Sequence, residues 1–250
     1  MSNSYFPPPR PQVEDRLAAG DAALDAAMSV FSTEHLECRF TLAATGERMR
    51  FIYCVRSGIL ARLMELPDGR EQIFMLRLPG DLVGLRCMIM ERQLDTIRVL
   101  APVLLQRLAS TQALALASDN SDIAVRFMWQ FAEDERRLHK WVIALGRGSA
   151  AARIAALVLD VRGRLLHAGL IGYHASFHLP LTQQQIADHL GTTLVHVNRT
   201  LRQLRGQNIL HLQRGRVKVL DLAALSELAR PIQDIYERAS AVFSATPDHC

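Results

Sequence analysis

The sequence contains no long hydrophobic run and no recognisable export signal. No apolar stretch approaches the roughly 20 residues that a membrane-spanning helix needs. Residues 1–11 are polar and rich in proline, whereas a signal peptide has a basic end followed by an apolar segment. These absences argue against a membrane protein and an exported one. We therefore expect a cytoplasmic chain with no membrane partner.

Cysteine is scarce and widely spaced. The nearest two of the four cysteines, Cys38 and Cys54, are too far apart in sequence for the clustered ligands of an iron–sulfur or zinc site, and Cys87 and Cys250 lie further along the chain. A disulfide framework is not expected without an export signal. The cofactor therefore stays unspecified, an iron–sulfur cluster is not favoured, and reduced thiols are expected.

Metal-binding and catalytic motifs are also missing. His167, His174 and His178 are close in sequence, but Gly172 and Pro180 oppose the helix that would align them as metal ligands. The chain has no phosphate-cradling glycine loop, no nucleophile elbow and no paired carboxylates in a catalytic setting. We predict no metal site, no catalytic residue and no enzyme activity.

Basic residues are concentrated in one segment. Between Gly146 and Leu222 there are ten Lys and Arg against three Asp and Glu, a net charge of +7, whereas the rest of the chain carries 19 basic and 22 acidic residues, a net charge of −3. Neutralising DNA phosphates requires such a local excess of positive charge. The distribution favours nucleic-acid binding by the C-terminal part.

The first half is predicted to be an irregular start followed by a β domain. Residues 1–24 lack helical periodicity and are expected to be flexible. Residues 25–117 contain short runs with strand character, such as 51–55 and 72–76. Turn signals separate these runs at Ser57-Gly58, Pro67-Asp68-Gly69 and Pro79-Gly80-Asp81. This spacing predicts a small β barrel or roll.

A long helix is predicted over residues 118–146, because Ser118-Asp119-Asn120 suits a helix start. One face carries large side chains at a period near 3.5 residues, which is typical of helices that pair with another helix. This seam consists of Phe127, Phe131, Asp134, Leu138, Trp141 and Leu145. We interpret it as a homodimer interface, the alternative being packing against the chain's own β domain. Residues 146–149 then predict a hinge.

The segment from Leu181 to Leu220 has the pattern of a helix-turn-helix. Thr182 and Gln185 form a capping box at the start of one helix, Gly191 ends it, and Thr193 caps the next. In this motif the second helix enters the major groove of DNA. The helix from Thr193 to Arg205 directs five candidate DNA-binding residues outward: Val195, His196, Asn198, Arg199 and Arg202. The capping residues Thr182 and Thr193 are further candidate DNA-binding residues.

A wing is predicted directly after this helix. Residues 209–212 alternate as a strand does, Gln213-Arg214-Gly215 makes a tight turn, and residues 216–220 return. Arg214, Arg216 and Lys218 can then reach the phosphate backbone. We therefore predict a winged helix-turn-helix domain over 147–222, followed by a C-terminal helix and tail over 223–250.

The outward residues predict how the helix reads DNA. Arg199 is expected to direct its guanidinium to the O6 and N7 atoms of guanine, and His196 to contact phosphate. Asn198 is either a base contact or a neutral surface residue. Val195 either packs against the protein or contacts a thymine methyl group.

With these motifs in place, the chain resembles the Crp/Fnr superfamily, named for the cyclic-AMP receptor protein and the fumarate–nitrate reductase regulator. Residues 181–191 and 195–199 look like its recognition motif, and Gly58, Gly69, Gly80 and Gly84 look like turn glycines of its β roll. The resemblance covers nearly all of the chain after about residue 25. It implies an α+β fold with an N-terminal β-roll sensor domain similar to a cyclic-nucleotide-binding domain, a long dimerisation helix and a winged helix-turn-helix of bacterial type.

Two positions depart from that family. Its nucleotide-binding members pair a glycine-glutamate with a downstream arginine-serine or arginine-threonine, but the candidate effector pocket here reads Gly84-Leu85 and Asp95-Thr96. Leu85 cannot accept a hydroxyl proton, and Asp95 puts a negative charge where a phosphate would sit. Cyclic AMP is therefore not favoured, although Arg92 or Arg98 could replace the missing cation.

The second departure is at Val195, where many members carry a glutamate that accepts a hydrogen bond from cytosine. The target site is therefore expected to differ from the best-known sites of the family.

The sequence thus predicts a transcription regulator that binds a palindromic site on double-stranded DNA as a homodimer and answers to an unidentified signal at the β roll. A constitutive regulator, whose sensor domain serves only as a dimerisation scaffold, is the alternative. RNA polymerase is a further expected partner if the protein activates transcription. The signal would act through the long helix on the spacing of two recognition helices, which must lie about 34 Å apart.

Overall fold

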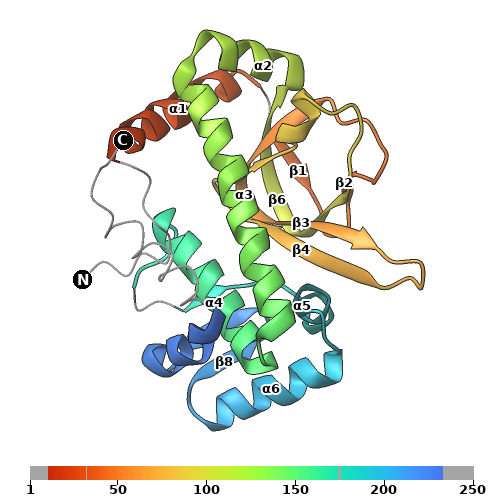
Figure 1. Ribbon diagram of the computed structural model, residues 1–250, viewed down its shortest axis with the longest axis vertical. Coiled ribbons are helices and arrows are strands. Elements are labelled where there is room, and N and C mark those ends of the chain that lie inside the picture. The colour runs from red at the N-terminus through yellow and green to blue at the C-terminus, as the bar shows by residue number, and fades with distance from the viewer. Residues whose placement is uncertain (1–10, 32, 174–175, 233–250) are drawn as a thin grey trace, which may run out of the picture. The chain divides into compact units, whose positions relative to one another are not determined.

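Figure 1 presents the protein as a computed structural model in which residues 11–31, 33–173 and 176–232 are described. The chain forms two compact units, and the division between them falls after Leu138, inside a long helix. The N-terminal unit contains the β domain and the C-terminal unit contains the helix-turn-helix.

The N-terminal unit is built on an antiparallel sheet of six strands that rolls up around its core. The main path through the sheet is β1-β6-β3-β4, with β2 paired to β6 and β5 paired to β3. The strands are β1 (Glu34–Leu36), β2 (Thr41–Ala43), β3 (Phe51–Glu65), β4 (Glu71–Arg77), β5 (Leu82–Val83) and β6 (Thr96–Ala109), and a short 3-10 helix, η1 (Leu85–Met88), follows β5. The β roll and the α+β class predicted from the sequence are confirmed.

One predicted turn is instead an irregularity inside a continuous strand. The pairing of β3 with β6 shifts register around Ser57, but β3 continues through this point to Glu65. Gly58 has a φ of 84°, and a Cβ atom there would lie 2.0 Å from the carbonyl oxygen of Pro102. Only glycine fits so close a backbone approach. The expected turn at Ser57-Gly58 is therefore wrong, whereas the turns at Gly69 and Gly80 are confirmed.

Two helices of the N-terminal unit differ from the expectations. They are α1 (Pro11–Ser29) and α2 (Ser110–Asp119). The flexible start expected for residues 1–24 is wrong from Pro11 onward, because α1 places Leu24 and Met28 in the hydrophobic core. Residues 1–10 lie outside the described part of the chain. α2 continues directly from β6, where the sequence predicted the end of the β domain.

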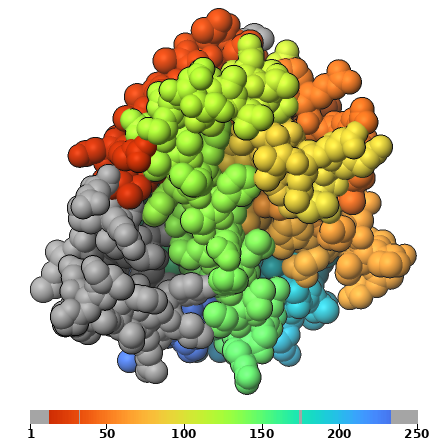
Figure 2. Space-filling view, turned by 45° about the horizontal axis from the view of Figure 1, so that its top comes forward, coloured from red at the N-terminus to blue at the C-terminus, as the bar shows by residue number. Residues whose placement is uncertain are grey.

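The long helix α3 (Ser121–Arg147) begins where the sequence predicted. The side-chain oxygen of Asn120 accepts a hydrogen bond from the amide of Asp122 at 2.9 Å, as an N-cap residue does. Ile123 and Phe127 anchor its first half in the core of the β roll. The other side of the helix is open, and Figure 2 shows α3 (green) as an exposed ridge.

The C-terminal unit is a winged helix-turn-helix, as predicted. It contains α4 (Ala150–His167), β7 (Phe177–His178), α5 (Gln183–Leu190), α6 (Leu194–Gly206), β8 (Leu210–Gln213) and β9 (Arg216–Val219). The three strands form an antiparallel sheet in the order β7-β9-β8. A last helix runs from residue 222 to residue 232, where the described part of the chain stops, and the rest of the predicted C-terminal segment lies outside it.

Within the described ranges, no helix is long and apolar enough to span a bilayer. The same residues contain no group of three His, Cys, Asp or Glu side chains placed to hold a metal ion. Of the histidines considered above as metal ligands, His174 lies outside the described part.

Candidate nucleic-acid interface

The ends of α5 and α6 are fixed by the side chains that the sequence indicated. The Thr182 hydroxyl accepts a hydrogen bond from the Gln185 amide at 3.1 Å, and the Gln185 side chain accepts one from the Thr182 amide at 2.8 Å. Gly191 ends α5 with a φ of 58°, and the Thr193 hydroxyl caps α6 by accepting from the His196 amide at 3.2 Å. Both predicted caps are confirmed, and they set the crossing of the two helices.

The two faces of α6 differ sharply. Val197, Leu201 and Leu204 are buried in the core of the unit. Thr200 also faces inward and donates a hydrogen bond to the His196 carbonyl at 2.9 Å. The outward face carries the five residues predicted to contact DNA: Val195, His196, Asn198, Arg199 and Arg202. Val195 is 75% exposed, so its methyl groups do not pack against the protein.

The wing is a two-residue hairpin. Gln213 of β8 pairs with Arg216 of β9, and the turn residues Arg214 and Gly215 both have positive φ, 50° and 75°. The Leu179 amide donates to the Gly215 carbonyl at 2.7 Å and ties the turn to the strand before α5. Val217 points inward while Arg216 and Lys218 are exposed. The tight turn and the exposed basic residues follow the prediction.

The cations of this surface lack acidic partners. Among the described residues, Arg199, Arg202, Arg214, Arg216 and Lys218 form no ion pair with a carboxylate. Arg199 approaches the ring of His196, with Nη2 3.5 Å from Nδ1. Elsewhere in the same unit cations are neutralised: Lys140 and Arg164 both pair with Asp160. Unpaired exposed cations on one surface are suited to phosphate.

A groove lies between α6 and the wing and brings several predicted residues together. Thr182, Asn198, Arg202 and Arg214 line it. Several other lining residues were not predicted from the sequence to bind DNA, among them Gln184, Arg205 and His211. Arg205 could have been found, since it follows Arg202 by three positions on the same face of the helix.

The turn between α3 and α4 is held by one arginine. Arg153 of α4 donates from Nη2 to the Leu145 carbonyl at 2.7 Å and from Nε to the Gly148 carbonyl at 3.0 Å. Its Nη1 donates to the Leu190 carbonyl at the end of α5, at 2.9 Å. Ser149 caps α4 by accepting from the Ala152 amide. The segment predicted to be a hinge is thus bonded to both neighbouring helices.

The side chains predicted to form a dimer seam on α3 do not all lie on the exposed face of this helix. Phe127, 4% exposed, belongs to the core of the β roll. Asp134 forms an ion pair with Arg77, and Trp141 packs edge to face on His189 with ring centroids 4.2 Å apart. These three contacts within the chain contradict the assignment of Phe127, Asp134 and Trp141 to a partner helix.

The open face of α3 has the same period but a different phase. It carries Met128, Phe131, Glu135, Leu138 and Val142, with Met128 61% and Val142 67% exposed. The spacing is 3, 4, 3 and 4 residues, as in a coiled-coil seam. Phe131 and Leu138 are common to this face and the predicted one. Leu145, the remaining predicted member, is half-buried.

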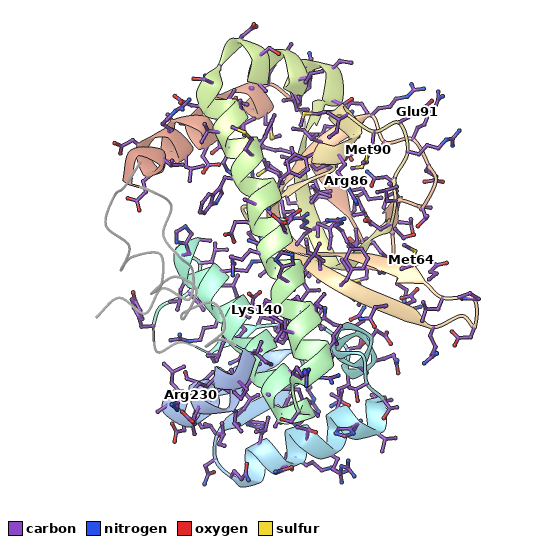
Figure 3. All side chains as sticks on the ribbon, viewed as in Figure 1. Met64, Arg86, Met90, Glu91, Lys140 and Arg230 are labelled. Carbon is purple, nitrogen blue, oxygen red and sulfur yellow. The ribbon has the colours of Figure 1, made fainter. Side chains whose placement is uncertain are left out.

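The candidate effector pocket contains a buried ion cluster. Asp95 accepts from Arg62 Nε at 3.2 Å and Arg62 Nη2 at 2.7 Å, and also pairs with Arg86 (labelled in Figure 3) of η1. Leu85 is buried, and Gly84 has a φ of 85° with its Cβ position 2.9 Å from the Phe51 carbonyl oxygen, so this turn favours glycine.

The two arginines suggested as substitutes in this pocket lie elsewhere. Arg92 donates to the Gly46 carbonyl, and Arg98 pairs with Glu65 and Glu71. The Thr96 hydroxyl oxygen accepts a hydrogen bond from the Thr45 amide at 3.3 Å, so Thr96 is also engaged within the protein.

The thiols of the sensor domain are held in their neutral form. Burial raises the pKa of Cys54 to about 11 and also raises the pKa of Cys87. Both thiols are therefore protonated at neutral pH, and thiols are far less reactive than thiolates. Cys38 is free and exposed, and Cys250 lies beyond the described ranges.

Comparison with known proteins gives two family matches. A family model described as a Crp-like helix-turn-helix domain matches residues 152–228, and one described as a cyclic nucleotide-binding domain matches residues 33–120. Together they include the β roll, α5, α6 and the wing.

Several characterised regulators are similar along most of their length. The nitrogen fixation regulation protein FixK of Bradyrhizobium diazoefficiens is 29% identical over 220 residues, which are 86% of this chain and 91% of that protein. The transcriptional activatory protein AadR of Rhodopseudomonas palustris is 31% identical over 179 residues, 71% of this chain and 73% of that protein. The solved structure of FixK2 from Bradyrhizobium japonicum shares the fold, with a TM-score of 0.72 and 23% identity over 79% of this chain and 96% of that one.

Proposed function

The chain belongs to the Crp/Fnr family of transcription regulators, and from this premise we propose that it binds palindromic double-stranded DNA as a homodimer. Its recognition element is the helix predicted from Thr193 to Arg205, which corresponds to α6 and its cap. The observation that carries the proposal is the outward face of α6 and the wing, where five cations have no acidic partner among the described residues.

In this proposal α6 reads bases with its first two turns. Arg199 offers a guanidinium fork for the O6 and N7 atoms of guanine, and the one side-chain hydrogen bond it makes among the described residues is a long one with His196. Val195 is exposed next to it and offers methyl groups to the methyl group of thymine. Asn198 lines the groove and is a second candidate base contact. His196 lies closer to the phosphates.

The wing and the capped start of α6 are proposed to position the domain on the sugar-phosphate backbone of DNA. Arg214, Arg216 and Lys218 reach phosphates beside the groove, and the amides at the capped start of α6 contribute partial positive charge. Thr182 and Thr193 cap the two helices by accepting amide hydrogen bonds, and a hydroxyl group that accepts in this way can also donate its hydrogen to a phosphate. These contacts make affinity depend on salt but not on sequence.

Dimerisation is proposed to use the open face of α3, namely Met128, Phe131, Glu135, Leu138 and Val142. A second copy of the same helix is the occupant that fits, because a 3.5-residue period allows two identical helices to pair around a two-fold axis. A two-fold protein then matches a two-fold palindrome.

The proposed role in transcription also suggests where the protein acts and which further partner it has. We place the protein in the cytoplasm, where bacterial DNA is, and propose RNA polymerase as a partner if the regulator activates. The relatives carry regulatory names and none of an enzyme, which agrees with a role in binding rather than catalysis.

The direct test is selection of binding sites from a random duplex DNA pool with the purified protein and with Arg199→Ala in parallel. We expect enrichment of a palindrome whose half-sites are one helical turn apart. The substitution should cost about 1 to 3 kcal/mol per half-site and relax the preference at one base pair. An equal loss of affinity on random DNA would make Arg199 a phosphate contact, and the absence of any palindrome would contradict the proposal.

A further inference from the structure

Five charged side chains, three of them buried and two partly buried, form a cluster in the N-terminal unit, which we name the sensor ion cluster. It joins three arginines from the sheet and η1 to two carboxylates, one of them on α3. Its members are Arg62, Arg77, Arg86, Asp95 and Asp134. The feature is notable because isolated charges are expensive to bury, whereas charges that pair with good geometry are tolerated.

Asp95 is the centre of one half of the cluster. Only 3% of the residue is exposed, and its two carboxylate oxygens accept from Nε and Nη2 of Arg62 at 3.2 and 2.7 Å. Arg86 approaches the same carboxylate from η1. Burial by itself would raise the pKa of Asp95, but the hydrogen bonds and charges of Arg62 and Arg86 lower it below its usual value. The carboxylate is therefore a fixed negative charge.

Asp134 carries the cluster onto α3. It accepts from Arg77 Nη1 at 2.6 Å and from the Gln130 amide group at 2.9 Å. Arg62 lies between the two carboxylates, with Nη1 3.6 Å from Asp134 and Nη2 2.7 Å from Asp95. Asp95 therefore determines where Arg62 rests, and Arg62 in turn contacts the helix that bears the open face.

A cavity of about 230 Å³ adjoins the cluster. Its wall includes the three arginines and the apolar side chains of Leu85, Phe131 and Leu138. The positive charges of the arginines are balanced by Asp95, Asp134 and Glu135, so the cavity has no excess charge to attract an anion. An anionic ligand that approached Arg62 and Arg86 would meet the carboxylate already bound there.

We infer that Asp95 is a built-in anion, which occupies the position that the negative group of a small effector would need. It holds Arg62 and Arg86, and through Arg62 it keeps Asp134 and α3 in one arrangement without a diffusible ligand. The inference rests on the proposed function and refines it, since it makes DNA binding independent of an anionic effector. These contacts favour the constitutive alternative over control by an anionic effector.

The test removes the built-in anion and supplies one from solution. Asp95→Ala leaves two guanidinium groups facing an enlarged cavity, and Arg62 can move fully to Asp134. We expect the DNA affinity of the full-length variant to fall about 10- to 100-fold in chloride buffer, within the usual range of coupling between sites. Acetate, a free carboxylate, should restore most of this loss at equal ionic strength, which must be matched because salt itself weakens DNA binding.

The wild-type protein and a control variant complete the design. Wild-type affinity should not change with acetate, inorganic phosphate or cyclic AMP, and Asp68→Ala should behave like wild type because its carboxylate pairs with Arg70 on an exposed turn. Asp95→Asn, which keeps the shape and loses the charge, covers the case in which the alanine variant does not fold.

A readout without DNA separates this inference from the proposed function. Acetate should raise the thermal unfolding temperature of Asp95→Ala and leave that of the wild type unchanged. The inference is overturned if wild-type DNA affinity rises tenfold or more with cyclic AMP or phosphate, or if Asp95→Ala and Asp95→Asn bind DNA like wild type. If no variant binds a palindrome and acetate still stabilises Asp95→Ala, the proposed function fails while the internal anion stands.

Discussion

Trp141 and Val142 are neighbours in sequence but lie about 100° apart around α3, one buried and one exposed, so substituting them in turn distinguishes the inner face of the helix from the outer one. Trp141 is 7% exposed and packs on His189 within the C-terminal unit, whereas Val142 is 67% exposed. We expect Trp141→Ala to destabilise folding and Val142→Glu to dissociate the dimer.

The magnitudes follow from burial. A buried Trp replaced by Ala costs about 3 to 5 kcal/mol of unfolding free energy, which lowers the melting temperature of a unit of this size by at least about 10 °C. Val142 has roughly two thirds of its surface still to bury, worth about 1 to 2 kcal/mol per copy. Two copies meet in a dimer, so the dissociation constant should rise about 30- to 1000-fold in Val142→Glu.

Sedimentation velocity over a range of protein concentrations measures the dimer, and thermal unfolding measures the fold. Val142→Ile is the matched control and should leave both unchanged. The reasoning is refuted if Trp141→Ala dissociates the dimer with no loss of melting temperature, or if Val142→Glu stays dimeric at nanomolar concentration. Either result would restore the seam predicted from the sequence alone.

Three further substitutions test other parts of the structure. Arg216→Ala should lower the slope of log affinity against log salt by about 1 per half-site while leaving the preferred sequence unchanged in a selection experiment. Gly58→Ala should cost more than about 1 kcal/mol in chemical unfolding, because its Cβ would clash with the Pro102 carbonyl at a positive φ. Because the folded pKa of Asp95 is lowered, its contribution to stability is complete above the unfolded pKa of about 3.9 and is lost as pH falls through the lower folded pKa. Acid titration of Asp95→Asn should therefore lack one component of the destabilisation seen in wild type.

Local signals explain why the DNA-binding half could be predicted so closely. A cap such as Thr182 and a turn glycine such as Gly191 act within three or four residues, so a single sequence displays both partners. The wing behaves in the same way, because the positive φ angles of the adjacent residues Arg214 and Gly215 define its turn, although the Leu179 amide also bonds the Gly215 carbonyl. Where a structure is decided locally, the pattern of the sequence was sufficient.

Local signals could not show which face of α3 is exposed. The sequence shows a period near 3.5 residues, which fits a seam through Phe127 and one through Met128 almost equally well. The choice depends on Arg77, which is distant in sequence and draws Asp134 inward. The sensor ion cluster was missed for the same reason, since Arg62 and Arg86 meet Asp95 only once the strands are rolled up. α1 was missed because its core contacts come from the roll.

Arg153 makes the junction between α3 and α4 stiffer than its two glycines, Gly146 and Gly148, would suggest. Its planar guanidinium donates hydrogen bonds to carbonyl groups at the ends of both α3 and α5, which restricts the motion of these two helices relative to each other. A rotation of the last turn of α3 must then move the helix-turn-helix in the same direction, because Arg153 is hydrogen-bonded to both. We therefore expect Arg153→Ala to loosen the link between the last turn of α3 and the helix-turn-helix without unfolding the C-terminal unit.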